Sequence, residues 1–367
     1  MRIGIDVRLT HYRTGGISTY MRRLLMALEA LDSANDYVEL HSRKSREKFT
    51  RRMGEARLWT PCHHRWERLA LSVELAPLRL GLLHSPDFIP PLRGARRHVI
   101  TVHDLTFLHY PQFVTADARR YYNGQIEAAV RQADHILVDS AATQRDLMEM
   151  LNVPAEKITV HLLGVDERFQ PMEVEALAEW QHKLDLPDGF ILFVGTIEPR
   201  KNISGLLAAY RMLRDRMKNA PPLVLVGRRG WLYEDTLRDI ERLDLSSQVI
   251  WREDVPDAAL PAVYNLASML VMPSFYEGFG FPALEAMACG TVPIVGNRSS
   301  LPEVVGEVGL QVEPEDSAAL ADALEKALTD APWRERMRRD GLARSREFTW
   351  ANTAEIVLRV YRHLGAN

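Results

Sequence analysis

Short apolar runs alternate with amphipathic stretches along this chain of 367 residues. Apolar runs bounded by turn residues predict buried strands, and apolar residues spaced three and four apart predict helices between them. The predicted strands are residues 2–7, 36–40, 81–84, 98–102, 135–139, 158–162, 190–194, 222–226, 248–251, 269–272, 292–295 and 309–312. The predicted helices include residues 17–31, 115–132, 141–151, 203–217, 257–267 and 317–329. This alternation indicates α/β architecture with parallel sheets covered on both faces.

Twelve strands are too many for one simple doubly wound sheet, and two separate strands lead into glycine-containing loops. A chain of this length is also long enough for two domains, each with its own core. We therefore predict two Rossmann-like halves. The chain passes from the first to the second near residues 164–171.

Composition agrees with an ordinary globular protein, because 46% of the residues are hydrophobic and 26% are charged. A net charge of −3 argues against nucleic-acid binding, which would require a strongly basic surface. Cys62 and Cys289 give no disulfide framework, which favours a reducing compartment. Met1 leads directly into a predicted strand, and no apolar run approaches the roughly 18–20 residues that span a bilayer. We expect a cytoplasmic protein.

The most informative stretch runs from Glu277 to Glu285. It follows a predicted strand and enters a predicted helix, so the first carboxylate should lie on the loop and the second in the first turns of the helix. The glycines at 278 and 280 allow close backbone approach, and Pro282 suits an early helical position. A helix N-terminus offers unpaired N–H groups to an anion. Two carboxylates on either side of a bound phosphate can hold hydroxyls, as a nucleotide-sugar site requires.

This stretch and its flanks, Met272 to Gly280 and Ala286 to Val295, resemble the E-x7-E motif of the retaining glycosyltransferases of family 4, which have the GT-B fold. Phe281 stands where that family usually has Leu. Residues 164–171 resemble the family's interdomain linker, with Leu163 in place of the usual Asn. The resemblance implies two Rossmann-like domains facing each other across a cleft. Residues 1–168 would form the acceptor domain, with a last helix over 349–367 packing back on it, and residues 169–348 the donor domain.

Other polar groups follow predicted strands, at the edge where such sheets bind ligands. Arg200 and Lys201 follow the strand at 190–194 and resemble the family's Arg-Lys pair. A planar guanidinium and a point charge can together bind a diphosphate, and their attraction grows as the leaving group gains charge. His103 follows the strand at 98–102, where its ring nitrogens can hold sugar hydroxyls. The resemblance places this histidine beside the donor sugar and the acceptor.

We therefore predict His103, Arg200, Lys201 and Glu277 as catalytic residues. Asp104 and Arg8 are predicted on the acceptor side, although Asp104 could equally cap a helix. Gly15 and Gly16 open a helix after the first strand and can approach a phosphate or a sugar edge, although a lone Gly-Gly can also be a simple turn. The predicted donor-binding residues are Gly15, Gly16, Gly195, Gly227, Val255, Gly278, Phe279, Gly280, Phe281, Leu284 and Glu285.

By resemblance, the chain is a retaining, metal-independent glycosyltransferase without a cofactor. It would move a hexose, in particular mannose from GDP-mannose, to a glycan or a lipid-linked saccharide. UDP-sugars are the next choice of donor, and a nucleotide-sugar epimerase of the same fold is the alternative enzyme. A dehydrogenase is disfavoured because G-x-G-x-x-G is absent, and a non-catalytic sugar-binding scaffold because His103, Arg200 and Glu277 are all present.

Residues 41–68 form a basic stretch that the predicted reaction does not explain. They contain nine Lys or Arg residues against three Asp or Glu, with Phe49, Leu58 and Trp66 interleaved. Such a stretch can be a solvated surface or can lie on anionic lipid at the inner face of the plasma membrane. Cys62, His63 and His64 resemble part of a metal site, but no second ligand cluster accompanies them, so we expect no zinc.

Overall fold

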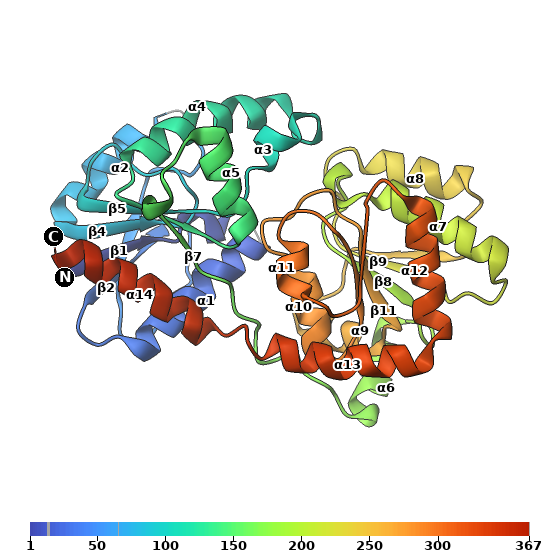
Figure 1. Cartoon of the computed structure of the whole chain (residues 1–367). Helices are drawn as coiled ribbons and strands as arrows, with labels where there is room; N and C mark the ends of the chain where they lie inside the picture. The colour runs from blue at the N-terminus through green and yellow to red at the C-terminus, as the bar shows by residue number, and fades with distance from the viewer. Residues whose placement is uncertain (13–14, 65, 367) are drawn as a thin grey trace. The chain divides into compact units, whose positions relative to one another are not determined.

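The computed structural model describes residues 1–12, 15–64 and 66–366, apart from the side chains of residues 116–118 and 120. The chain forms two compact units. The first contains Met1–Gly164 and the segment from Thr349 onward, and the second contains Val165–Phe348. Each unit has its own parallel sheet with helices around it (Figure 1).

The sheet of the first unit has seven strands in the order β3-β2-β1-β4-β5-β6-β7, all parallel. Their bounds are β1 Arg2–Asp6, β2 Asp36–Ser42, β3 Gly54–Leu58, β4 Leu80–Ser85, β5 Ala95–Val102, β6 His135–Val138 and β7 Ile158–Val160. The α-helices of this unit are α1 Gly16–Leu31, α2 Glu67–Leu75, α3 Thr106–His109, α4 Ala116–Gln132, α5 Ala141–Leu151 and α14 Trp350–Ala366.

The sheet of the second unit has six parallel strands in the order β10-β9-β8-β11-β12-β13. Their bounds are β8 Ile191–Val194, β9 Leu223–Val226, β10 Val249–Arg252, β11 Met269–Met272, β12 Pro293–Gly296 and β13 Leu310–Val312. The α-helices are α6 Val174–Leu184, α7 Ile203–Arg216, α8 Tyr233–Arg242, α9 Leu260–Leu266, α10 Phe281–Ala288, α11 Leu301–Val305, α12 Ser317–Thr329 and α13 Ala331–Ser345.

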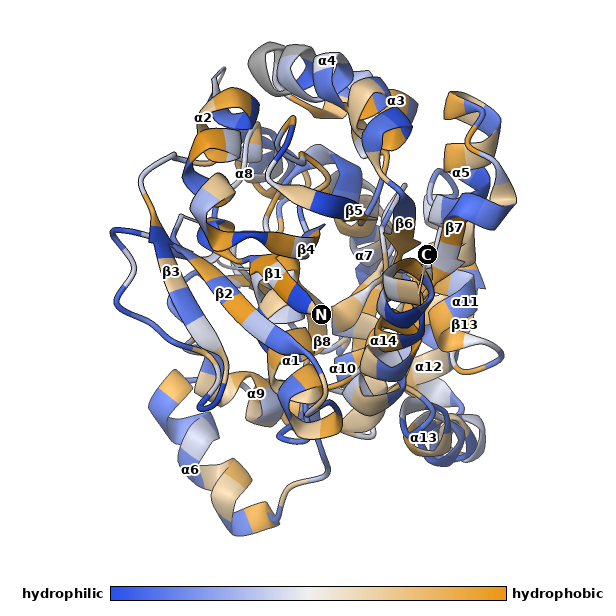
Figure 2. Ribbon diagram, turned by 90° about the vertical axis from the view of Figure 1, so that its left-hand side faces the viewer, coloured by the Kyte–Doolittle hydropathy of each residue, from blue (hydrophilic) through white to orange (hydrophobic). Residues whose placement is uncertain are grey.

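These two parallel α/β units confirm the fold class predicted from the sequence, and each of the twelve predicted strands overlaps an observed one. Strand β3 was missed because it lies at a sheet edge and carries Glu55 and Arg57, so it lacks a continuous apolar run. The core strands β4 and β8 are buried along most of their length. Figure 2 shows hydrophobic residues within strand β1 and a largely polar helix α13.

The last helix, α14, belongs to the first unit, where it packs against α1 (Figure 1). The hydroxyl of Thr353 donates a hydrogen bond to the carbonyl of Leu162, at 2.7 Å. A Cβ atom at Gly164 would lie 2.2 Å from the backbone nitrogen of Trp350. Because glycine has no Cβ atom, the backbone at residue 164 can lie directly against the start of α14.

Gly195 and Gly227 lie just beyond the carboxyl ends of β8 and β9, where the two backbones approach closely. Gly227 has a φ of +152°, and a Cβ atom there would lie 1.9 Å from the carbonyl oxygen of Gly195. A side chain at 227 would therefore push the two strand ends apart.

Gly227→Ala should therefore lower the free energy of unfolding by on the order of 3 kcal/mol, because the methyl group meets backbone atoms that cannot rotate away. Gly124 is the matched control, since it lies inside α4 and a Cβ atom there meets nothing within 4 Å. Gly124→Ala should raise stability by up to about 1 kcal/mol through helix propensity. Denaturant unfolding measures the change in the free energy of unfolding for both variants. Equal changes in the two variants would contradict the steric argument.

Among the described residues, no helix is both long enough and apolar enough to cross a lipid bilayer.

Candidate active site

Four charged side chains form a cluster at the carboxyl ends of β8 and β11 in the second unit. Glu277 accepts hydrogen bonds from Nη1 of Arg200 and from Nζ of Lys201, each at 2.6 Å. Glu198 pairs with Nε of Arg200 at 2.5 Å. Lys201, Glu198 and Glu277 are buried, and Arg200 is partly buried. Two cations and two carboxylates thus neutralise each other at the edge where parallel sheets bind ligands.

The clamp, as we call Arg200 and Lys201, is held by local structure on both sides. The two residues lie in a single 3₁₀ turn over Pro199–Lys201, directly before α7. Asn202 follows with a φ of +56°, and its side chain accepts a hydrogen bond from the Gly205 amide at the start of α7. The same side chain donates to the carbonyl oxygens of Pro273 and Pro314, so Asn202 ties the turn to the loops after β11 and β13.

Glu277 lies on the loop between β11 and α10, and two serines hold that loop. The Ser299 hydroxyl accepts a hydrogen bond from the Glu277 amide at 2.8 Å. The Ser300 hydroxyl lies 2.9 Å from the carbonyl of Glu277 and 2.8 Å from that of Phe279. The carboxylate position is therefore fixed by backbone contacts as well as by its ion pairs.

Burial and charge act in opposite directions on this cluster. Burial alone would raise the pKa of Glu277, but Arg200 and Lys201 outweigh it and lower that pKa to about 2. Burial raises the pKa of Glu198. Burial and the neighbouring Arg200 lower the pKa of Lys201, against the two carboxylates. Glu277 is accordingly ionised at neutral pH and serves as the counterion of the clamp.

Glu285 lies in α10, which begins at Phe281 with Pro282 in its first turn. The Tyr264 hydroxyl donates a hydrogen bond to Glu285 at 2.7 Å. Burial is the main cause that raises the pKa of Glu285 to about 7, against the Tyr264 hydrogen bond and the positive charge of Arg168. The two glutamates of the motif therefore differ in chemistry, since one is a permanent anion and the other titrates near neutrality.

The raised pKa of Glu285 has a consequence for stability. A carboxyl group with a folded-state pKa above its unfolded value favours the folded state at low pH, and this contribution is lost as pH rises from about 4.5 to about 7. Glu285→Gln should therefore stabilise the free protein at pH 8 by about 3 kcal/mol relative to the wild type, and by little at pH 4.5. Thermal unfolding at the two pH values measures this, and a stabilisation independent of pH would contradict it.

In the first unit, His103 lies just after β5, at the carboxyl edge of the sheet. Its Nδ1 lies 2.6 Å from a carboxylate oxygen of Asp139, and its Nε2 lies 2.8 Å from the carbonyl oxygen of Pro86. The Tyr20 ring packs against it edge-on, with centroids 5.1 Å apart. The side chain is 14% exposed. Both ring nitrogens thus have partners within the protein, so sugar hydroxyls would have to compete for them.

The acceptor-side predictions concern Arg8 and Asp104. Arg8 is buried, and its guanidinium donates to the carboxylates of Asp6 and Glu67 and to the carbonyl oxygen of Thr60. These contacts make it a structural centre that joins β1, the end of β3 and α2. Asp104 accepts a hydrogen bond from the Thr106 amide at 2.9 Å, so its side chain holds the local turn that leads into α3, whose N-cap residue is Leu105.

The remaining predicted donor residues lie where loops meet helices. Gly16 is the first residue of α1, and Gly15 precedes it with a φ of +134°; residues 13 and 14 lie outside the described part of the chain. Phe279 and Leu284 are buried, so only their backbone atoms could contact a ligand. Gly195, Gly227, Val255, Gly278 and Phe281 are partly buried, whereas Gly280 is buried with a φ of +107°.

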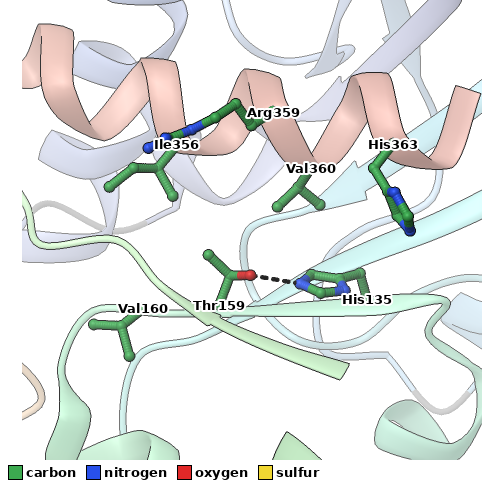
Figure 3. A pocket seen from close by; sticks show the side chains of 7 residues that line it. All are labelled: His135, Thr159, Val160, Ile356, Arg359, Val360 and His363. Atoms are coloured by element: carbon green, nitrogen blue, oxygen red, sulfur yellow. Dashed lines mark hydrogen bonds between the residues drawn. The ribbon is translucent and has the colours of Figure 1, made fainter. Parts of the chain in front are cut away.

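The structure also contains a hollow that none of the predicted residues lines. It has a volume of about 440 Å³ and lies between α14 and the strands β6 and β7 of the first unit (Figure 3). The residues that line it are His135, Thr159, Val160, Ile356, Arg359, Val360 and His363. Nε2 of His135 lies 2.8 Å from the Thr159 hydroxyl.

Three side chains in these sites were not predicted as site residues from the sequence. Asp139 directly follows β6, so the signal that singled out His103, a polar residue after a buried strand, was available for it too. Glu198 lies two residues before Arg200, and no role was predicted for it. Tyr264 lies in α9 among apolar residues, and nothing in its surroundings indicates a contact with Glu285.

Comparison with known families assigns both units. Residues 175–344 match the family described as "Glycosyl transferases group 1", and residues 14–169 match "Glycosyltransferase Family 4". O-antigen chain mannosyltransferase B of Escherichia coli is 35% identical over 77% of this chain and 74% of its own length.

Two further relatives are longer than the region they share with this chain. Serotype-specific mannosyltransferase WbdA of Escherichia coli is 34% identical over 77% of the chain but only 36% of its own length. A D-inositol 3-phosphate glycosyltransferase of Corynebacterium glutamicum is 33% identical over 69% of the chain and 62% of its own length.

Solved structures agree with the fold. Sucrose-phosphate synthase from Thermosynechococcus elongatus has a TM-score of 0.82 at 23% identity, covering 100% of this chain and 99% of its own. WaaG, a glycosyltransferase involved in lipopolysaccharide biosynthesis, has a TM-score of 0.76 at 14% identity, covering 98% and 99%. Taken with the family matches and the clamp at the strand ends, these comparisons show that the chain belongs to the GT-B glycosyltransferases and resembles bacterial mannosyltransferases.

Proposed function

We propose that the protein transfers mannose from GDP-mannose to a glycan or lipid-linked saccharide, with retention of configuration and without a metal ion. The observation that carries this proposal is the cluster of Arg200, Lys201 and Glu277 at the strand ends, in a chain 35% identical to an O-antigen chain mannosyltransferase. The cluster supplies charge for a diphosphate, and the relatives indicate the sugar.

The clamp accounts for the absence of a metal ion from the proposed reaction. Breaking the bond between the sugar and the diphosphate increases negative charge on the leaving group. Arg200 and Lys201 place two cations where a divalent ion would otherwise stabilise that charge, and the N-terminus of α10 adds backbone N–H groups. Turnover that is unchanged after dialysis against a strong chelator is the expected result, and loss restored by Mg²⁺ would contradict it.

Retention is proposed to proceed on one face of the sugar, with the diphosphate leaving and the acceptor entering on the same side. Both oxygens of Glu277 accept hydrogen bonds from the clamp, which lowers their nucleophilicity and favours a positioning role for this carboxylate. Proton NMR of the product at early time points reads the anomeric configuration directly. An inverted anomer would contradict this part of the proposal.

The donor is tested by thermal unfolding with nucleoside diphosphates. A ligand at 100 times its Kd stabilises the folded state by about 2.7 kcal/mol, which is readily measured. We expect a larger shift with GDP than with UDP, and release of GDP from GDP-mannose when a mannosylated acceptor is present. A larger shift with UDP would contradict the choice of GDP-mannose.

A UDP-sugar is the second candidate donor, because a solved structure of the same fold has been determined with that nucleotide. HepE of Anabaena, in complex with UDP and glucose, has a TM-score of 0.77 over 99% of this chain at 17% identity. At that identity the likeness concerns the fold alone. The nucleotide comparison above decides between the two donors.

We further propose that residues 41–68 contact anionic lipid and so bring a lipid-linked acceptor within reach. Most of the basic residues in this range are exposed, with Arg65 outside the described part of the chain. Trp59 and Trp66 are 69% and 56% exposed. The sequence prediction was wrong for Leu58, which is buried in the core beside β2 and α2 and cannot reach a membrane.

Trp59→Ser and Trp66→Ser should each weaken binding to phosphatidylglycerol vesicles several-fold, because each removes an exposed aromatic side chain suited to the membrane interface. Leu232→Ser is the matched control, since Leu232 is 54% exposed but belongs to the second unit. Vesicle sedimentation measures the binding, with phosphatidylcholine vesicles as the neutral surface. Equal binding by all three variants and the wild type would contradict this contact.

A further inference from the structure

The two contacts of His103 constrain its protonation. Nδ1 faces a carboxylate of Asp139 and Nε2 faces the carbonyl of Pro86, at 2.6 and 2.8 Å. A carbonyl oxygen can only accept a hydrogen bond, and an ionised carboxylate can only accept as well. When both of these oxygens accept, both ring nitrogens of His103 must carry hydrogen, and the ring is a cation.

A buried chain of hydrogen bonds beneath His103 involves two other histidines. Its members, in order, are Tyr361, His84, Thr101, Tyr20, His161 and the carbonyl of Val138. Because the Val138 carbonyl accepts, Nδ1 of His161 donates to it, at 2.9 Å. A neutral His161 then accepts from the Tyr20 hydroxyl at Nε2. The remaining bonds follow in the same direction, ending with the Tyr361 hydroxyl donating to Nδ1 of His84.

With His161 neutral, every hydrogen bond of the chain is made when His84 is neutral as well. Both histidines are fully buried, and burial lowers the pKa of each. The second oxygen of Asp139 has no hydrogen-bond partner among the residues that the structure describes, and it lies 3.8 Å from Nε2 of His161. Within the described part of the chain, the Asp139 carboxylate is therefore hydrogen-bonded to the His103 ring alone.

The other titratable groups around His103 come from several elements. Asp87 after β4 and Asp104 after β5 both favour a charged ring, whereas His84 in β4 and His161 after β7 would oppose it if they were charged. Burial lowers the pKa of His103, but Asp139 outweighs burial and the pKa is raised. The immediate surroundings thus contain three carboxylates and two neutral histidines.

We propose that Asp139 is a positioning residue that holds His103 as an imidazolium with both N–H groups committed, so that transfer depends on a fixed cation at this strand end. The role of His103 in transfer rests on the proposed function, whereas its protonation state does not. An imidazolium has no lone pair, so His103 in this form cannot take a proton from an acceptor hydroxyl. With both N–H groups bound to Asp139 and Pro86, it acts instead as an oriented positive charge.

The protonation state can be measured without any substrate. In full-length protein labelled with ¹⁵N, two-bond ¹H–¹⁵N correlation spectra distinguish imidazolium from either neutral tautomer. The His103 signals are identified by their absence from His103→Gln. We expect both His103 nitrogens to remain protonated up to pH 8, while His84 and His161 are neutral at pH 6. A single protonated His103 nitrogen at pH 7 overturns the proposal.

Asp139→Asn tests the consequence for transfer. Without the carboxylate, the largest cause that opposes burial is lost and the His103 pKa should fall, so kcat should fall at least about tenfold between pH 6 and pH 8. The wild type should change less than twofold over that range, and KM for the donor should change little in either protein. A pH profile of Asp139→Asn parallel to that of the wild type overturns the proposal.

Asp146→Asn is the matched control. Asp146 lies 2.9 Å from Nε2 of His109, a second Asp-His pair in the same unit, on α5 and α3. This variant should keep the wild-type pH profile. Should Asp139→Asn fail to fold, the spectra of the wild-type protein decide the matter. Should no donor be turned over, the proposed function fails, while the spectra still test the Asp139–His103 pair.

Discussion

Alanine at Lys201 or Arg200 is expected to lower turnover by about 100-fold or more, with a smaller change in the Kd for the nucleoside diphosphate. The reason is that the leaving diphosphate carries its greatest charge in the transition state, where a fixed cation contributes most. Lys201 is buried and contacts Glu277 at 2.6 Å, so its position is fixed before substrate arrives. No reorganisation is then needed at the moment of bond breaking.

Matched controls separate this effect from general loss of positive charge. Lys183 is an exposed cation of the same unit and Arg211 a partly buried one, and each is paired with an acid on its own helix. Lys183→Ala and Arg211→Ala should retain wild-type turnover, because surface ion pairs contribute little. Steady-state kinetics and calorimetry of diphosphate binding give kcat and Kd separately. Wild-type turnover in folded Lys201→Ala or Arg200→Ala would show that the clamp does not contribute to the rate of transfer.

The sequence predicted the fold well because buried parallel strands carry a local signal. The strands β8 and β11 are continuous apolar runs, and the polar residues that follow them mark the ligand-binding edge. Strand β3 gave no such signal, because an edge strand with one exposed face tolerates Glu55 and Arg57. Leu58, at the end of that strand, was consequently assigned to the surface although it is buried.

The sequence suggested candidate residues for the site, but it did not indicate how those residues pair with one another. The sequence presented Arg200 and Lys201 as free cations for a diphosphate and Glu277 as a group for sugar hydroxyls. In the structure Glu277 is the counterion of both, across 76 and 77 residues of sequence. The same holds for His103 and Asp139, which lie after neighbouring strands. Such pairs depend on strand order, and strand order has no local signature.

The pairing of Glu277 leads to a prediction that the motif alone would not give. Glu277→Gln should lower the free energy of unfolding of the free protein by about 3–5 kcal/mol, because Lys201 loses its hydrogen-bonded counterion and Arg200 keeps only Glu198. A group whose pKa is lowered to about 2 stabilises the folded state above its ordinary pKa. The difference in the free energy of unfolding between the variant and the wild type should therefore become smaller as pH falls from about 4.5 toward 2. Glu253→Gln is the control, since Glu253 pairs with Arg229 at an exposed site and should cost little.

A nucleoside diphosphate should restore much of the lost stability in Glu277→Gln, because its phosphates supply the missing negative charge. The variant should bind the diphosphate at least as tightly as the wild type, where Glu277 competes for the same cations, and yet transfer sugar poorly. Glu285→Ala should behave in the opposite way and weaken diphosphate binding, because by resemblance this acid contacts the ribose hydroxyls. Thermal unfolding with and without ligand, together with calorimetry, compares the two variants. Equal loss of diphosphate affinity in both variants would show that Glu277 and Glu285 do not contact different parts of the donor.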